Sequence, residues 1–197
     1  MVTAEPAKRV FFALWPTEAQ QNALAGATLD VVRASGGRPV PSLSLHTTLS
    51  FLGSVPERRI QDLGSIARRV AGASAVGAAP LLLEFDHIEY WKKPRILCVV
   101  AQGESPQVLA LADALAKETV GAGFNPDLKP FRPHVTLARK VSHPIPTTNM
   151  DPVVCGFTEF ALVESRTEPG GSAYTVLQTF PWGARRGPDS LLDAHSA

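Results

Sequence analysis

The sequence predicts a mixed α and β protein built from two similar halves. Each half reads as a strand, a helix and then a strand with the string H-x-T-L, which starts at His46 in the first half and at His134 in the second. Phe11 lies 35 positions before His46, and Leu97 lies 37 positions before His134. This similar spacing indicates an internal duplication with the two histidines in equivalent places.

The first half should begin with a buried strand over residues 9–15, which is apolar and is followed by proline. Thr17 and Gln20 match a helix N-cap with a capping box, so a helix is expected up to the Gly-Gly pair. A second strand is predicted over residues 42–53. A second capped helix should open near Glu57.

The second half should repeat this order after an Ala/Gly-rich loop over residues 71–79. Two paired strands, a helix, the second motif strand and a final hairpin are predicted, at 81–91 with 95–102, 106–121, 131–140, and 155–165 with 172–182. We expect one bilobal domain with its core at about 9–182 and a mobile tail over 183–197.

Composition narrows the class of protein. A net charge of +1 over 197 residues argues against a long duplex-DNA groove, but it allows a local site for one phosphate. Cys98 and Cys155 lie in apolar runs and are expected to be buried free thiols, too few for a thiolate zinc site. We find no signal peptide or apolar run long enough to span a membrane, so a cytoplasmic monomer is expected.

Both motif strands should place a histidine and a threonine on one face, because side chains on a strand alternate. The first strand divides into His46, Thr48 and Ser50 on a polar face and Leu45, Thr47, Leu49 and Phe51 on an apolar face. The second strand divides into Arg132, His134 and Thr136 against Val135 and Leu137. Arg139 has the opposite parity to His134, but it lies at the strand end, where alternation often fails.

These residue types suit hydrolysis of a cyclic phosphodiester. Imidazole, with an ordinary pKa near 6.5, can deprotonate water or protonate a departing oxygen at cellular pH. Thr48 and Thr136 can donate hydrogen bonds to non-bridging oxygens, and Arg132 or Arg139 can add positive charge. No carboxylate cluster accompanies either motif in the sequence, so we expect a reaction without metal or other cofactor.

Plainer interpretations stay open for single residues. One H-x-T string alone would indicate a structural histidine; the repeated pair favours catalysis. Thr48 and Thr136 also suit strands as β-formers. Phe51 fits the core at least as well as a base-stacking platform, and both arginines also fit a solvated surface. Three further histidines receive no predicted role: His87, His143 and His195.

The sequence around the motifs resembles that of a known family. His46-Thr47-Thr48-Leu49 and His134-Val135-Thr136-Leu137 are similar to the paired H-x-T-x motifs of the two-histidine phosphoesterases. The strings RVFFALWP, HTTLSFLG and FRPHVTLAR narrow this resemblance to the RNA 2′,3′-cyclic phosphodiesterase branch, also called the 2′-5′ RNA ligase family. The resemblance covers about residues 9–182.

The resemblance implies a bilobal α+β fold, in which two pseudo-symmetric antiparallel β-sheet lobes carry helices on the outside and flank a central cleft. It implies hydrolysis of an RNA terminal 2′,3′-cyclic phosphate to a 2′-phosphomonoester, with His46 as proton donor to the departing 3′-oxygen and His134 as the base. The family also includes members that join tRNA halves through a 2′-5′ linkage, so RNA ends and tRNA halves are the expected partners.

Two other functions remain open from the sequence. The chain could be a non-catalytic module that binds nucleotide monophosphates through the same donors. It could also be an esterase for a different diester, such as a cyclic ADP-ribose phosphate or a 2′-5′ oligonucleotide.

Overall fold

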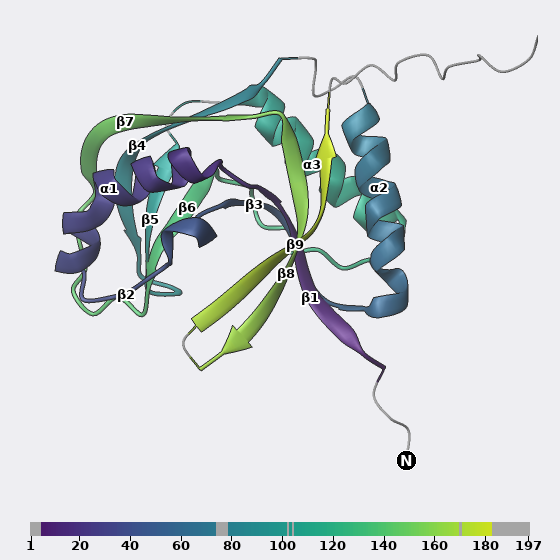
Figure 1. The fold of residues 1–197 in the computed structure, drawn as a ribbon, viewed down its shortest axis with the longest axis horizontal. Coiled ribbons are helices and arrows are strands. Elements are labelled where there is room, and N and C mark those ends of the chain that lie inside the picture. The colour runs from purple at the N-terminus through teal and green to yellow at the C-terminus, as the bar shows by residue number, and fades with distance from the viewer. Residues whose placement is uncertain (1–4, 74–78, 102, 104, 170, 183–197) are drawn as a thin grey trace, which may run out of the picture.

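A computed structural model describes residues 5–73, 79–101, 103, 105–169 and 171–182. Within these residues the chain forms two antiparallel sheets and three α-helices, an α+β fold (Figure 1). In chain order the elements are β1 (Ala7–Leu14), α1 (Glu18–Ala34), β2 (Arg38–Pro39), β3 (Thr47–Pro56), α2 (Ile60–Gly72), β4 (Leu81–Trp91), β5 (Ile96–Ala101), α3 (Pro106–Gly121), β6 (His134–Arg139), β7 (Thr148–Phe157), β8 (Glu159–Glu168) and β9 (Gly171–Pro181).

The predicted duplication is visible in the strand pairing. One sheet has the order β3-β1-β8-β9, and the other has the order β2-β6-β5-β4-β7. Each motif strand pairs antiparallel with the strand that opens its unit, β3 with β1 and β6 with β5. The two motif strands therefore occupy corresponding places in two separate lobes.

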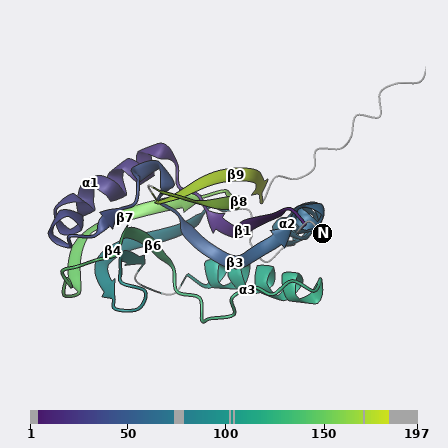
Figure 2. The ribbon, with the colours of Figure 1, turned by 90° about the horizontal axis from the view of Figure 1, so that it is seen from below.

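The lobes nevertheless exchange elements, so they are not simply the two halves of the sequence. The C-terminal hairpin β8–β9 joins the first sheet beside β1, and β2 edges the second sheet beside β6. Helix α1 packs on β6 and β7, whereas α2 and α3 pack on each other and on strands of the first sheet. Figure 2 shows α1 and α3 on opposite sides of the molecule. Neither lobe can be completed without residues from both halves.

One hydrophobic core connects both sheets with all three helices. Phe12 and Phe160 contribute from the first sheet and Phe85 from the second, and all three are fully buried. Leu24 of α1 and Leu111 of α3 enter the same cluster. Burial of such side chains is the largest favourable contribution to folding, and it orients the opposite faces of both sheets away from this core.

Local sequence signals at the first helix are confirmed, and the segment after it differs. The Thr17 side chain accepts a hydrogen bond from the Gln20 backbone, and the Gln20 side chain accepts one from the Thr17 backbone, so the capping box is present. Residues 42–44 form a 3-10 turn instead of the start of a strand. The Gln21 side chain donates to backbone carbonyls in this segment, which takes the place of strand pairing.

Other boundaries also differ from the sequence predictions. Strand β3 continues to its proline, so α2 begins at Ile60 after a 3-10 turn and without a side-chain cap. Strand β2 and most of β7 were not predicted, since the strand predicted over 155–165 covers only the end of β7 and most of β8. Asp151 and Pro152 are poor strand formers, and β7 tolerates them because it is an edge strand. Residues 74–78, Gly170 and the tail 183–197 lie outside the described residues.

Cys98 and Cys155 are buried free thiols, as predicted. Within the described parts of the chain, none of the helices combines the length and apolar character needed to cross a membrane.

Candidate active site

A β-bulge in β3 decides which residues reach the face that carries His46. Leu49 is an extra residue in the pairing with β1, because the residues on either side of it pair with consecutive residues of β1. The bulge reverses the alternation, so Ser50 is buried at 4% exposure opposite a core residue, and Phe51 packs on the other face with Phe11. The predicted faces of Ser50 and Phe51 are therefore wrong.

A second bulge occupies the same place in β6. Leu137 is the extra residue here, because Thr136 and Ala138 pair with consecutive residues of β5. Arg139 then pairs with Ile96, whose side chain belongs to the same face as that of Cys98, the partner of Thr136. The bulge thus returns Arg139 to the face of His134, which simple alternation does not predict.

His46 lies just before β3 among aromatic rings. Its ring stacks on Trp15, with centroids 5.1 Å apart, and on Phe11 at 5.0 Å, and it meets the edge of Tyr174 at 4.9 Å. Its Nδ1–H donates to the carbonyl of Ser44 at 2.7 Å. Because a carbonyl can only accept, the proton of the neutral ring lies on Nδ1, and Nε2 is left with a free lone pair.

His134 opens β6 with the same ring orientation in a different setting. Its Nδ1–H donates to the carbonyl of Arg132 at 2.8 Å, so its Nε2 is again left available. The Trp91 ring lies against it, with centroids 4.5 Å apart. His134 pairs across the sheet with Val100 of β5.

Charges from the second sheet affect the pKa of His46, which lies beside the first sheet. Burial lowers the pKa of His46 to about 4, and the nearby positive charges of Arg139 and of protonated His134 lower it as well. Burial also lowers the pKa of His134, and the charges of Arg132 and Arg139 act in the same direction. Both imidazoles are therefore mainly neutral at pH 7 in the free protein, and both sense Arg139.

Arg139 connects the two lobes. Its Nη2 donates to the hydroxyl of Tyr174 in β9 at 3.4 Å. Tyr174 also packs against His46, so the site faces of the two sheets meet at this contact. The described residues thus bring six predicted site residues onto these two faces: His46, Thr48, Phe51, His134, Thr136 and Arg139.

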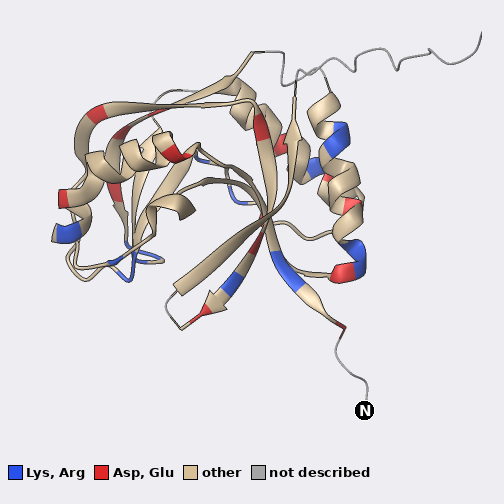
Figure 3. Cartoon of the chain, in the orientation of Figure 1, with Lys and Arg blue, Asp and Glu red and all other residues tan. Residues whose placement is uncertain are grey.

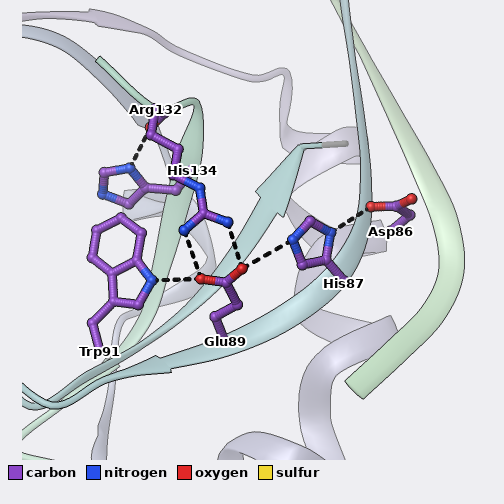
Figure 4. A network of polar contacts seen from close by, with 6 residues as sticks. All are labelled: Asp86, His87, Glu89, Trp91, Arg132 and His134. Carbon is purple, nitrogen blue, oxygen red and sulfur yellow. Dashed lines mark hydrogen bonds and ion pairs between the residues drawn. The ribbon is translucent and has the colours of Figure 1, made fainter. Parts of the chain in front are cut away.

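Arg132 is placed differently from the other predicted residues. Its guanidinium makes a forked ion pair with Glu89 of β4, and the same carboxylate accepts the Trp91 indole N–H at 2.8 Å (Figure 4). His87 bridges Glu89 and Asp86 on the far side of this network. The side chain of Arg132 is therefore engaged by Glu89, and its substrate-binding role stays a prediction.

Glu89 and His87 were not predicted as site residues. A signal was present, because residues 87, 89 and 91 alternate along a predicted strand and include a histidine, a carboxylate and an indole. What the sequence could not show is that β6 lies two strands away from β4 in the same sheet, within reach of the Arg132 side chain. Among the described residues, no three His, Cys, Asp or Glu side chains group closely enough to hold a metal ion.

The comparison with protein-family models identifies the family. The model of the 2′-5′ RNA ligase superfamily matches residues 16–160. The chain belongs to this superfamily. Both H-x-T-L motifs and both bulges fall inside the matched residues.

Relatives from two organisms and a crystal structure match most of the chain. It is 34% identical to an RNA 2′,3′-cyclic phosphodiesterase of Thermus thermophilus, over 87% of this chain and 89% of that protein. It is 29% identical to the Escherichia coli protein of the same name, over 89% of this chain and 96% of the relative. The crystal structure of E. coli LigT with 3′-AMP has a TM-score of 0.79 at 25% identity and covers 90% of this chain and 99% of its own.

Proposed function

We propose that the protein hydrolyses RNA terminal 2′,3′-cyclic phosphates to 2′-phosphomonoesters without a metal ion. The observation that carries this proposal is the pair of motif histidines from different lobes. Each donates its Nδ1–H to a backbone carbonyl and keeps Nε2 available, and the charge of Arg139 lowers the pKa of both. The names of the relatives, RNA 2′,3′-cyclic phosphodiesterase, support the same substrate.

In the proposed mechanism, His134 Nε2 removes a proton from water as its oxygen forms a bond to phosphorus. The bond between phosphorus and the 3′-oxygen breaks, and protonated His46 gives its Nε2 proton to that oxygen. The product carries a 2′-phosphate and a 3′-hydroxyl. If a 5′-hydroxyl of a second RNA end attacks phosphorus in place of water, the same step joins the two ends through a 2′-5′ linkage. Reversible 2′-5′ ligation of tRNA halves is therefore part of the proposal.

The other site residues stabilise charge in this mechanism. Thr48 and Thr136 donate hydrogen bonds to the non-bridging oxygens, and Arg139 compensates the negative charge that grows on them. Phe51 offers an apolar surface to a base. The backbone carbonyl of Arg132 accepts the Nδ1–H of His134, so Arg132 acts mainly by orienting that ring. We expect the protein to act as a monomer.

Phosphorus NMR of adenosine 2′,3′-cyclic phosphate with the protein and a chelator tests the reaction. We expect the cyclic resonance to be replaced by that of the 2′-monophosphate at the same rate with and without chelator. Formation of the 3′-monophosphate, or loss of turnover on chelation, would contradict the proposal. Tight binding of 2′-AMP with no turnover would indicate a nucleotide-binding module, and faster turnover of another diester would indicate a different esterase.

Replacing either motif histidine tests the acid–base pair. His46→Ala and His134→Ala should each lower kcat by roughly 10² or more, because each removes a proton-transfer group. His143→Ala is the matched control, since His143 is an exposed histidine with no contact to either motif ring. Near-native turnover in a motif variant would exclude that residue from proton transfer.

A further inference from the structure

A pocket of about 460 Å³ adjoins the candidate active site. It lies between the lobes, with β2 and the end of β6 on one side and the β8–β9 hairpin on the other. Ser44, Arg139 and Tyr174 belong both to its lining and to the surroundings of the two histidines. The histidines themselves are not part of its lining, so the pocket extends the site in one direction.

Two arginines lie side by side on the wall of this pocket that the sheet forms. Arg38 of β2 and Arg139 of β6 are directly paired across the sheet, and both line the pocket. Like charges in this arrangement repel each other and destabilise a sheet. In the part of the chain that the structure describes, neither guanidinium forms an ion pair with a carboxylate. Glu168 also lines the pocket, and its negative charge raises the pKa of Arg166.

The Arg38 guanidinium reaches from one lobe to the other. A Cβ atom at Gly171 would lie 3.3 Å from its Nη2 and 3.4 Å from its Cζ, so the first residue of β9 lies directly against it. Gly171 has φ of +142°, a conformation that other residues rarely adopt. The sequence thus provides a glycine at the point where the guanidinium meets the opposite lobe.

Further basic residues extend this positive region along the end of the five-stranded sheet. Ile96, Arg139 and Arg38 lie in register on three adjacent strands, and the β4–β5 turn lies beside them. This end of the sheet carries Arg38, Lys92, Lys93, Arg95, Arg139 and Lys140. Figure 3 shows basic segments gathered at this end, below the strands of the second sheet. Such a concentration in a chain of net charge +1 indicates an anionic partner.

We propose that this pocket binds the phosphodiester that links the terminal nucleotide of the RNA to its 5′ neighbour, with Arg38 as its main ligand. The inference rests on the proposed function. When the cyclic phosphate occupies the site between the histidines, the RNA chain continues on only one side, so the next anion is this diester. Arg139 is taken by the reacting phosphate, and Arg38, which has no carboxylate partner among the described residues, matches that second charge. The enzyme therefore prefers RNA ends to nucleoside cyclic phosphates.

Kinetics with and without the second phosphate test the subsite. The substrates are adenosine 2′,3′-cyclic phosphate, its 5′-phosphorylated form and a diadenosine that ends in a cyclic phosphate. We expect kcat/KM of the wild type to be roughly tenfold or more higher with the second phosphate, the size of a charge-assisted contact. Arg38→Gln should remove most of this preference, and Arg33→Gln, at the exposed end of α1, should keep it. Equal losses of Arg38→Gln on all three substrates would overturn the proposal.

A binding measurement separates this inference from the proposed function. The Kd values of adenosine 2′-monophosphate and adenosine 2′,5′-bisphosphate are compared by calorimetry in wild type and Arg38→Gln. If the wild type binds the bisphosphate more tightly than the monophosphate and Arg38→Gln loses this difference, the subsite is supported. This holds even if no cyclic phosphate is hydrolysed, in which case only the proposed reaction fails. Equal Kd values for both ligands in the wild type would overturn the subsite, whatever the turnover.

Discussion

The two motif histidines share their backbone setting and differ in their surroundings. Each donates its Nδ1–H to the carbonyl two residues earlier, at 2.7 Å for His46 and 2.8 Å for His134. Each packs against a tryptophan, and each is followed by a threonine and a bulged leucine. The repeated motif therefore sets the orientation of the ring and the position of its Nε2.

The neighbours differ because they come from unrelated strands. His46 is enclosed by the rings of Phe11, Trp15 and Tyr174, which offer no counter-charge, and burial lowers its pKa to about 4. His134 borders the ion pair of Arg132 with Glu89. The motif therefore determines the geometry of each ring, whereas the surrounding residues determine how readily that ring holds a proton.

The pH dependence should give the largest effect. Because burial lowers the pKa of both histidines in the free protein, both limbs of the kcat/KM profile should lie below pH 6.5, the ordinary imidazole value. Above the optimum, kcat/KM should fall about tenfold per pH unit as the acid loses its proton. A bound phosphate favours the imidazolium and raises its pKa, so the kcat profile should lie at higher pH. A kcat/KM profile flat from pH 5 to 9 would contradict the pair.

Arg139→Gln should give the next largest effect. Loss of its charge should lower kcat/KM for adenosine 2′,3′-cyclic phosphate by about 10², because transition-state charge on the phosphate oxygens is no longer compensated. It should also raise the pKa of His46, since the charge of Arg139 lowers that pKa. Arg69→Gln, on the exposed side of α2, is the control. A decrease in kcat/KM of less than threefold would show that Arg139 does not contact the reacting phosphate.

Glu89→Gln tests the polar surroundings of His134. We expect kcat to fall roughly tenfold with little change in KM, because Trp91 and Arg132 lose the carboxylate that orients them beside His134. The Arg132 charge would lose its partner, so the pKa of His134 should fall and its limb in the pH profile should move to lower pH. Glu84→Gln, exposed on the same strand, is the control. A purely structural role would lower stability and leave the limb in place.

Phe51→Leu should have the smallest effect. Phe51 lies five residues after its motif histidine, as Arg139 does, and its bulge brings it to the site face. Its ring is partly covered by the Arg9 guanidinium, 4.8 Å from the centroid. We expect KM to rise roughly twofold to threefold with kcat unchanged, because leucine keeps part of the apolar contact with a base. A large loss of kcat would show that the ring positions His46.

Sequence alone predicted the parts of the protein that depend on neighbouring residues. The capping box at Thr17, the strand–helix–strand order and the two H-x-T-L motifs are local patterns, set by hydrogen bonds and side-chain periodicity over a few positions. The same reasoning predicted that Cys98 and Cys155 would be buried, because each lies within an apolar run. The paired motifs also indicated the family that the comparisons identified.

Only the tertiary structure decided which side chains join the motifs. A bulge depends on how one strand pairs with another, so the sequence could not show that Leu49 and Leu137 reverse the alternation and bring Phe51 and Arg139 to the site. The strand order likewise decided that Glu89 holds Arg132. These contacts join residues far apart in the chain, and their geometry follows from packing two lobes against each other, which no local pattern encodes.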